Sequence, residues 1–271
     1  MEPPTREAEV LELCRHLKLP TVGREALRLA TEASRQQVSP LAYLVNVLTL
    51  ELAEREERRA ARRIKAAGFP LPKTLESFDF QRAAHLPEAR LRELATGTYL
   101  ARAEPILFLG ESGTGKTHLA TALGMAAAQA GHAVRFVTAA QVVTELIEAR
   151  DAHDLNRLVG RYSRVEVLIL DELGYLPLAR ADADLLFRVL SDRHERRPVI
   201  VTTNLPFSEW TTVFPDARLC RAVVDRLTHR AHIIETGIHS IRLADTLART
   251  EKGRRSPRDP PAVSKPTTAS P

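Results

Sequence analysis

The sequence predicts an α/β protein in which a parallel sheet, covered by helices on both faces, follows a small all-α region. Two observations lead to this prediction. Through the middle of the chain, short apolar runs of strand character alternate with segments of helical character, and buried strands separated by helices are typical of parallel sheets. The first 70 residues, in contrast, are rich in Leu, Ala, Glu and Arg and nearly lack strand signals.

The composition is that of a folded globular protein. The chain has 271 residues, of which 44% are hydrophobic and 27% are charged, and this length allows one large domain or two unequal ones. Its two cysteines, Cys14 and Cys220, are far apart, which excludes a disulfide framework and a cysteine-rich zinc site. Because no apolar run approaches the ~18 residues of a membrane helix and the N-terminus is too polar for a secretory signal, we expect a reduced cytoplasmic protein with no membrane partner.

Residues 1–70 are predicted to form a helical domain that ends in one long helix. Ser39 followed by Pro40 is a helix start signal, and Gly68 with Pro70 is a stop signal. Between them, apolar residues recur at helical spacing. The long helix is therefore expected to run from about residue 40 to residue 67.

Residues 71–250 carry the predicted sheet, and residues 251–271 form a basic, proline-rich tail that we expect to be disordered because it cannot bury a core. Five apolar runs are the expected strands, at residues 105–109, 134–137, 165–170, 198–204 and 232–235. Segments of helical character lie between them.

A phosphate-binding loop follows the first predicted strand. The segment GESGTGKT matches the pattern G-x-x-x-x-G-K-[ST] and precedes a helix of small and apolar residues. In this context the glycines let backbone N–H groups point at phosphate at the positive end of the helix, while Lys116 reaches the β- and γ-phosphates and Thr117 binds Mg²⁺. The expected nucleotide-binding residues are Gly110, Glu111, Ser112, Gly113, Thr114, Gly115, Lys116, Thr117 and His118.

Two further strands are predicted to bring polar groups to the same sheet edge. Asp171 and Glu172 follow the run VEVLIL, where Asp171 could hold Mg²⁺ and Glu172 could polarise the attacking water. The alternative is a helix-capping pair. Asn204 ends the run VIVTTN and is predicted to hold that water or to sense the γ-phosphate. The alternative for Asn204 is a turn before Pro206.

This order of phosphate loop, acidic pair and polar sensor resembles the additional-strand class of P-loop ATPases, which includes the AAA+ family. The resemblance implies a sheet of strand order 5-1-4-3-2 and hydrolysis at subunit interfaces, with an arginine supplied by the neighbouring subunit. Arg226, in a helix just before the last strand, matches the position of this trans-acting arginine best. Arg242, after that strand, is the candidate second sensor. A solvated helix face accounts for the other arginines beside Arg226, namely Arg218, Arg221 and Arg230.

Longer segments resemble the IstB type of transposition helper ATPase, which is bacterial. They are GESGTGKTHLA, LDELGYLPL, VTTNLPFSEW and VVDRLTHRAHIIETG, and the resemblance covers residues 1–248. It implies an ATP- and Mg²⁺-dependent homo-oligomer that binds or remodels target DNA and recruits or stimulates a transposase. A helicase loader of the DnaC type, with a replicative helicase as partner, is the first alternative. An adaptor that binds ATP but hardly hydrolyses it is the second.

A basic stripe on the long helix is the predicted contact to double-stranded DNA. On a helical wheel most of its members cluster on one side, opposite Ala60, Ala61 and Ile64. The alternative is a solvated face whose arginines pair with glutamates along the helix. If the stripe does contact DNA, the absence of aromatic residues from it favours contact with the DNA backbone over base reading. The predicted DNA-binding residues are Arg58, Arg59, Arg62, Arg63 and Lys65.

The net charge of +5 is distributed unevenly. Residues 1–70 hold 12 basic and 10 acidic residues, and residues 251–271 hold 5 and 2. The middle of the chain is therefore neutral, and the polyanionic partner that the charge suggests is expected to contact the helical region or the tail.

Overall fold

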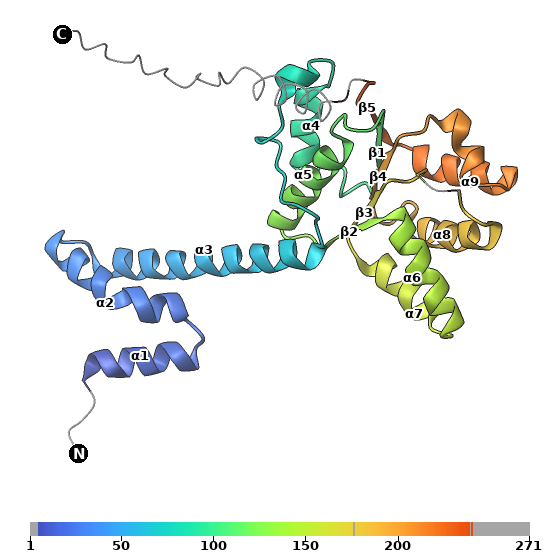
Figure 1. Ribbon diagram of the computed structural model, residues 1–271. Helices are drawn as coiled ribbons and strands as arrows, with labels where there is room; N and C mark the ends of the chain where they lie inside the picture. The colour runs from blue at the N-terminus through green and yellow to red at the C-terminus, as the bar shows by residue number, and fades with distance from the viewer. Residues whose placement is uncertain (1–4, 176, 239, 241–271) are drawn as a thin grey trace, which may run out of the picture.

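The structure is a computed structural model that describes residues 5–175, 177–238 and 240. Within these ranges the chain begins with three helices, and Figure 1 shows the third as a long rod that leads from the first two into the α/β core. Side-chain caps explain where two of the helices start: Thr5 accepts a hydrogen bond from the Ala8 N–H and Ser39 accepts one from the Ala42 N–H. The helices are α1 (Arg6–His16), α2 (Pro20–Arg35) and α3 (Pro40–Ala67).

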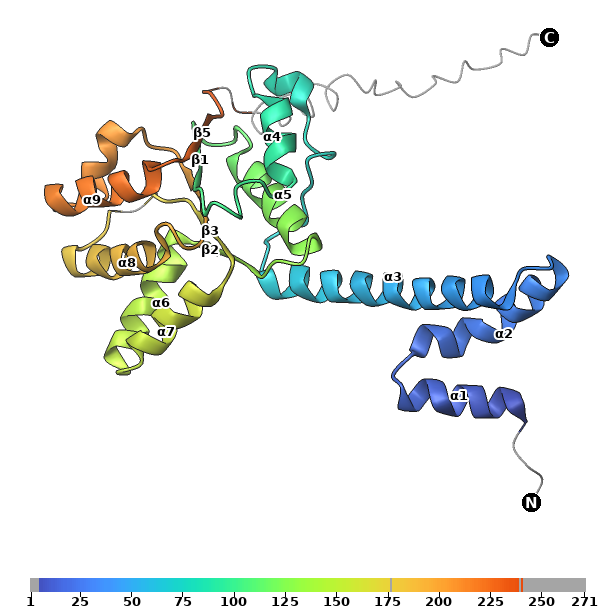
Figure 2. The same cartoon turned by 180° about the vertical axis from the view of Figure 1, so that it is seen from behind.

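The long helix has the predicted bounds. Pro40 occupies its first turn, and Gly68 ends it in the left-handed region at φ 77°, a conformation that glycine adopts without steric cost. α2 lies along its N-terminal half and α1 packs against α2, both away from the core, as both views show (Figure 1, Figure 2). The C-terminal end of α3 contacts the core instead, where Arg63 Nε donates a 2.8 Å hydrogen bond to the Ala128 carbonyl.

Five parallel strands form one sheet in the order β2-β3-β4-β1-β5. Read from the other edge, this is the order 5-1-4-3-2, which confirms the prediction. The strands coincide with the five predicted apolar runs to within about two residues at each end. They are β1 (Ile106–Leu109), β2 (Val134–Thr138), β3 (Val167–Asp171), β4 (Val199–Thr203) and β5 (His232–Glu235).

Helices cover both faces of the sheet, as the continuous apolar strands require. Side chains of β1 alternate between two cores, with Ile106 and Phe108 facing one and Leu107 and Leu109 the other. The first core also contains residues of α4 (Glu88–Ala95), α5 (Lys116–Gln129) and the end of α3. The second core contains residues of α6 (Ala139–Asp151), α7 (Leu155–Arg164), α8 (Arg180–Arg193) and α9 (Ala217–Thr228).

The carboxyl ends of β1, β3 and β4 meet at one edge of the sheet, where α5 also begins. Two short 3₁₀ helices, Phe80–Ala83 and Phe207–Thr212, lie in the connecting segments. None of the helices in the described part of the chain is long and apolar enough to cross a membrane.

Candidate nucleotide-binding site

The predicted phosphate-binding loop connects β1 to the first residue of α5, so the positive end of that helix faces whatever the loop holds. Gly110 and Gly115 have φ values of 150° and 99°. A Cβ atom on Gly115 would lie 2.6 Å from Phe78 Cε2, and one on Gly110 would lie 2.7 Å from the Gly237 carbonyl oxygen. Both positions therefore require glycine for backbone conformation and for space.

The two side chains that close the loop motif reach different partners. Lys116 Nζ donates hydrogen bonds to the carbonyl oxygens of Gly110 and Glu111 at 2.6 and 2.8 Å, so it lies along the loop. Thr117 Oγ1 donates to Asp171 Oδ1 at 3.0 Å. A hydroxyl and a carboxylate side by side supply the oxygen ligands that Mg²⁺ prefers. The pair therefore fits the predicted metal site.

Asp171 ends β3 at this edge and Glu172 follows it, and neither residue caps a helix. The next helix, α8, begins at Arg180 with Ala179 as its cap residue, so the capping alternative is wrong. Asp171 is buried at 5% exposure. Glu172 has a left-handed backbone at φ 58°, which turns the chain sharply after the strand.

Thr202 of β4 fixes this acidic pair, and sequence reasoning overlooked it. Its hydroxyl donates to Asp171 Oδ1 at 2.5 Å and accepts a 2.9 Å hydrogen bond from the Glu172 N–H. One buried side chain therefore orients the carboxylate of Asp171 and the backbone of Glu172. The signal in the sequence was a hydroxyl residue two positions before Asn204, on the strand that neighbours the acidic one.

A cavity of about 650 Å³ opens beside the loop. Glu172 and Asn204 line it from the ends of β3 and β4, together with Lys116 and Thr117. The structure thus brings most of the predicted loop, Glu172 and the predicted sensor to one cavity, while Asp171 lies behind Thr117. Other described residues that line it include Lys73, Ser77, Phe78, Asp79, Arg82 and Tyr175.

The wall opposite the strand ends comes from residues 70–82, which the sequence did not assign to the site. Phe78 is 7% exposed and its ring packs edge-on against His118 at a centroid distance of 5.1 Å. His118 Nε2 also lies 2.9 Å from the Thr74 carbonyl oxygen and 3.2 Å from Ser77 Oγ. Burial lowers the pKa of His118 below its ordinary value, so the ring is neutral at pH 7.

Arg226 lies far from the loop of its own chain. It is in the last turn of α9, where its guanidinium stacks on the Phe187 ring at 4.6 Å and donates to the Ala222 carbonyl at 3.2 Å. It lines a cavity where the strands begin, at the edge opposite the loop. Arg242 and the tail at residues 251–271 lie outside the described residues.

The five basic residues predicted to contact DNA do not share one environment. Arg63 contacts the backbone of α5. Arg58 donates to Thr21 Oγ1 at 3.3 Å and lies 3.6 Å from Glu51, and Arg59 pairs with Glu56. Among these five, the exposed cations that have no hydrogen bond or ion pair with the described residues are Arg62 and Lys65.

The fold is that of the AAA+ P-loop ATPases, as the resemblance predicted. DnaA from Aquifex aeolicus with bound AMPPCP matches with a TM-score of 0.54 at 21% identity over 70% of this chain and 58% of that one. A crystal structure of DnaI matches with a TM-score of 0.51 at 20% identity, over 60% and 90% of the two chains.

Sequence relatives extend the likeness to nearly the whole chain. An ATP-binding protein of insertion sequence IS5376 from Geobacillus stearothermophilus is 36% identical over 241 residues, which is 89% of this chain and 96% of that one. The IS21 ATP-binding protein of Pseudomonas aeruginosa is 36% identical over 237 residues, or 88% and 89%. The model of the family described as "IstB-like ATP binding protein" matches residues 12–248. The chain therefore belongs to this IstB-like family.

Proposed function

We propose that this protein is an ATP-dependent, DNA-binding ATPase of a bacterial insertion sequence, acting in the cytoplasm as a homo-oligomer. It binds or remodels target DNA and recruits or stimulates the partner transposase. The observation that carries the proposal is one cavity lined by Lys116, Thr117, Glu172 and Asn204, in a chain whose relatives are ATP-binding proteins of insertion sequences.

The chemistry follows from the positions of these groups. The loop N–H groups, the first turn of α5 and Lys116 hold the triphosphate. Thr117 and Asp171 would hold Mg²⁺, which would supply charge neutralisation at the phosphates. Glu172 polarises the attacking water, and Asn204, across the same cavity, holds that water or contacts the γ-phosphate. Thr202 keeps the Asp171 carboxylate and the Glu172 backbone in place by its two hydrogen bonds.

Hydrolysis at subunit interfaces is part of the proposal because of where Arg226 lies. Transfer of the γ-phosphate builds charge that an arginine stabilises by about 10³–10⁵ in rate. Arg226 cannot reach the loop of its own chain, since it lines a cavity at the other edge of the sheet. We therefore assign it to the site of the neighbouring subunit, with Arg242 as the second sensor.

We assign residues 1–70 to a DNA-contacting domain and residues 71–250 to the ATPase domain, followed by the basic tail at residues 251–271. The support for the first assignment is the solvent-exposed end of the basic stripe on α3, at Arg62 and Lys65. Phosphate contacts of this kind fix a protein on DNA without reading its sequence.

Glu172→Gln tests the catalytic part of the proposal. ATP still binds to this variant, but water activation is lost, so we expect ATP hydrolysis to fall at least ~10²-fold and ATP-bound oligomers to accumulate on DNA. Hydrolysis and DNA release are measured with the full chain, duplex DNA and Mg²⁺. In an adaptor that hardly hydrolyses ATP, the Glu172→Gln change would alter neither quantity, and that result would overturn the proposal.

The partner is tested separately. Pull-down with the transposase encoded beside this protein should recover the complex in the presence of ATP, whereas a replicative helicase should not bind. Capture of the helicase and not of the transposase would instead identify a helicase loader. The Lys116→Ala variant is the matched control, because it removes the group that reaches the β- and γ-phosphates and leaves the outer surface of the protein unchanged.

A further inference from the structure

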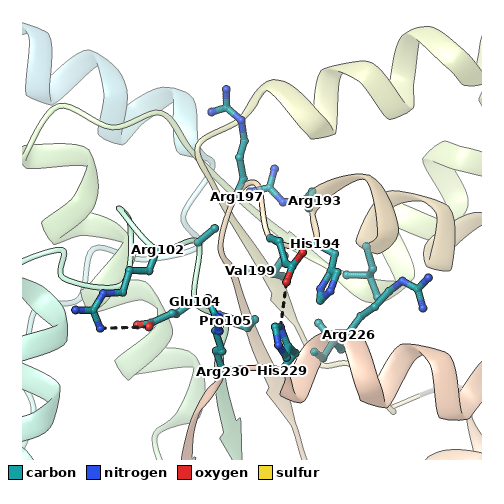
Figure 3. A pocket seen from close by; sticks show the side chains of 14 residues that line it. Arg102, Glu104, Pro105, Arg193, His194, Arg197, Val199, Arg226, His229 and Arg230 are labelled. Carbon is teal, nitrogen blue, oxygen red and sulfur yellow. Dashed lines mark ion pairs between the residues drawn. The ribbon is translucent and has the colours of Figure 1, made fainter.

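A second cavity, of about 300 Å³, lies at the amino ends of the strands, where β4 and β5 begin, on the side of the sheet away from the phosphate loop (Figure 3). Its walls include the turns that connect α8 to β4 and α9 to β5. His194 and Glu195 come from the first turn and His229 from the second. Figure 3 shows His194 and His229 near each other, and Glu195 forms an ion pair with His229. No step of the proposed ATPase chemistry uses them.

The three side chains are close enough to share one ion. One ligand atom from each lies within 4.8 Å of the other two. His229 Nδ1 is 3.5 Å from Glu195 Oε1, and the two imidazole centroids are 5.5 Å apart. Tetrahedral coordination with metal–ligand bonds of about 2.0–2.2 Å places ligand atoms roughly 3.4 Å apart. The Glu195–His229 pair already has this spacing, and rotation of the His194 ring brings in the third ligand.

We propose that His194, Glu195 and His229 form a binding site for a divalent transition-metal ion, with Zn²⁺ as the best fit. Two imidazoles and one carboxylate are a ligand set that zinc takes in proteins, with a fourth position left for water. Imidazole nitrogen also favours Zn²⁺ over Mg²⁺, which prefers oxygen ligands. The ion would join the C-terminal ends of α8 and α9.

The electrostatics of the backbone favour a cation at this place. His194 is the C-cap residue of α8 and His229 is the C-cap residue of α9. The negative ends of both helix dipoles therefore face the cluster. Glu195 has a left-handed backbone at φ 56°, and its carboxylate lies beside His229.

Arginines also line this cavity, but most of their guanidinium groups are directed elsewhere. In Figure 3 those of Arg102, Arg197 and Arg226 point away from the cluster. Arg102 pairs with Glu104, and Arg226 stacks on Phe187. Arg193 is buried and donates to backbone carbonyls, among them those of Tyr162 and Pro198. Burial lowers the pKa of Arg193 to about 9, which leaves it charged at neutral pH.

An ordinary ion pair does not account for the whole cluster. Such a pair needs only Glu195 and His229, whereas the His194 ring lies tilted beside the same imidazole, at a centroid distance of 5.5 Å, and has no part in that pair. A metal ion uses all three groups and requires both rings to be neutral. The two explanations therefore differ in whether His194 contributes to the binding of a metal ion.

The test is a titration of the full, tag-free, metal-stripped protein with ZnCl₂ by calorimetry, and with CoCl₂ by the visible absorption of bound Co²⁺. We expect saturable binding of one ion per chain, unaffected by excess Mg²⁺. His194→Ala, Glu195→Gln and His229→Ala should each weaken binding at least tenfold. No nucleotide or DNA is present, so failure of this inference and failure of the proposed ATPase function are distinguishable.

His132→Ala is the matched control. His132 Nδ1 lies 2.6 Å from Glu166, so this variant removes a histidine–glutamate pair that lacks a third ligand among the described residues. It should bind the ion as the unaltered chain does. Retention of full binding in the His194→Ala variant would contradict the three-ligand site. The absence of saturable binding in the unaltered chain would leave only the Glu195–His229 ion pair and overturn the proposal. Glu195 is exposed, so Glu195→Gln tests the site even where a histidine variant unfolds.

Discussion

Glu51 shows what the sequence reveals and what it hides at the scale of one residue. It pairs with Arg55, one turn along the same helix, at 3.1 Å, as helical spacing allows. Yet Glu51 is only 4% exposed, and its other oxygen accepts hydrogen bonds from the N–H groups of Thr21 and Val22 at 2.8 and 3.1 Å. The start of α2 has no side-chain cap of its own, so Glu51 of α3 caps it. A cap 29 residues away along the chain leaves no local signal.

Glu51→Ala should therefore destabilise the helical region by about 2 kcal/mol, since two buried N–H groups lose their acceptor. Burial alone would raise the pKa of Glu51, but the N–H groups of Val22 and Thr21 and the Arg55 guanidinium outweigh it and hold the pKa below the ordinary value. A lowered carboxyl pKa contributes stability above the unfolded-state pKa, and this contribution is lost as the pH falls through the folded-state pKa.

Urea unfolding at pH 7 and at pH 4 measures both effects. The difference between the unaltered chain and the Glu51→Ala variant should be large at pH 7 and should shrink at pH 4. Glu57→Gln, an exposed change on the same helix, should alter the free energy of unfolding by less than about 0.5 kcal/mol. Equal stability of the Glu51→Ala variant and the unaltered chain at pH 7 would contradict the capping role.

Thr202→Val tests the positioning of the acidic pair. The change keeps the volume of the side chain but removes the donor to Asp171 and the acceptor for the Glu172 N–H. We expect ATP hydrolysis to fall about tenfold or more, with a smaller effect on ATP affinity, because the loss affects geometry needed in the transition state. Thr202→Ser retains the hydroxyl and should restore most of the rate. Equal rates in the two variants would mean that the hydrogen bonds have no positioning role.

At the scale of an element, α3 was predicted at both ends and only partly along its surface. Ser39, Pro40 and Gly68 are local signals, so the helix bounds follow from the sequence. Which arginines stay free depends on what packs against the helix. Arg63 lies on the side that meets α5, and Arg58 lies near α2. A helical wheel gives angles between side chains but not the identity of the neighbouring elements.

Because Arg62 and Lys65 of the basic stripe are exposed whereas Arg63 contacts α5, variants of the two groups should have different effects. Arg62→Ala with Lys65→Ala should reduce the slope of log affinity for duplex DNA against log salt by about 1.8, since each phosphate contact contributes about 0.9, and should leave stability unchanged. Arg63→Ala should instead lower the free energy of unfolding by about 1 kcal/mol, through loss of its hydrogen bond to Ala128. An unchanged slope in the double variant would remove these two residues from the DNA surface.

At the scale of the whole molecule, the strands and the polar residues at their carboxyl ends, beside the phosphate loop, were predictable. The reason is that the strand, loop and helix signals are contiguous in sequence. The strand order itself came from the family resemblance and not from the apolar pattern. The far wall of the nucleotide cavity could not be predicted, because Phe78 meets Gly115 from a distant part of the chain and no local pattern reports such a contact. The histidine cluster at the opposite edge was missed for the same reason, since His194 and His229 come from different turns.

The two edges of the sheet lead to a prediction about the assembly. The ATP site lies at the carboxyl ends of the strands and Arg226 lies near their amino ends. A site completed by Arg226 therefore needs a second subunit. Lys116→Ala and Arg226→Ala should each be inactive alone, by about 10³-fold for the arginine. Mixed in equal amounts, they should regain activity. An Arg226→Ala subunit then offers an intact loop to a Lys116→Ala neighbour that still supplies the arginine.

Random mixing of the two variants gives roughly a quarter of interfaces with both groups intact in a cyclic or helical assembly, so the recovered ATPase rate should approach that fraction of the unaltered rate. Arg221→Ala, an exposed change on the same helix, mixed with Lys116→Ala serves as the control for assembly. If Arg226 acts within its own chain, every chain in the mixture lacks either Lys116 or Arg226, and the mixture stays inactive. Because each variant alone is inactive, recovery can arise only from a site shared between subunits.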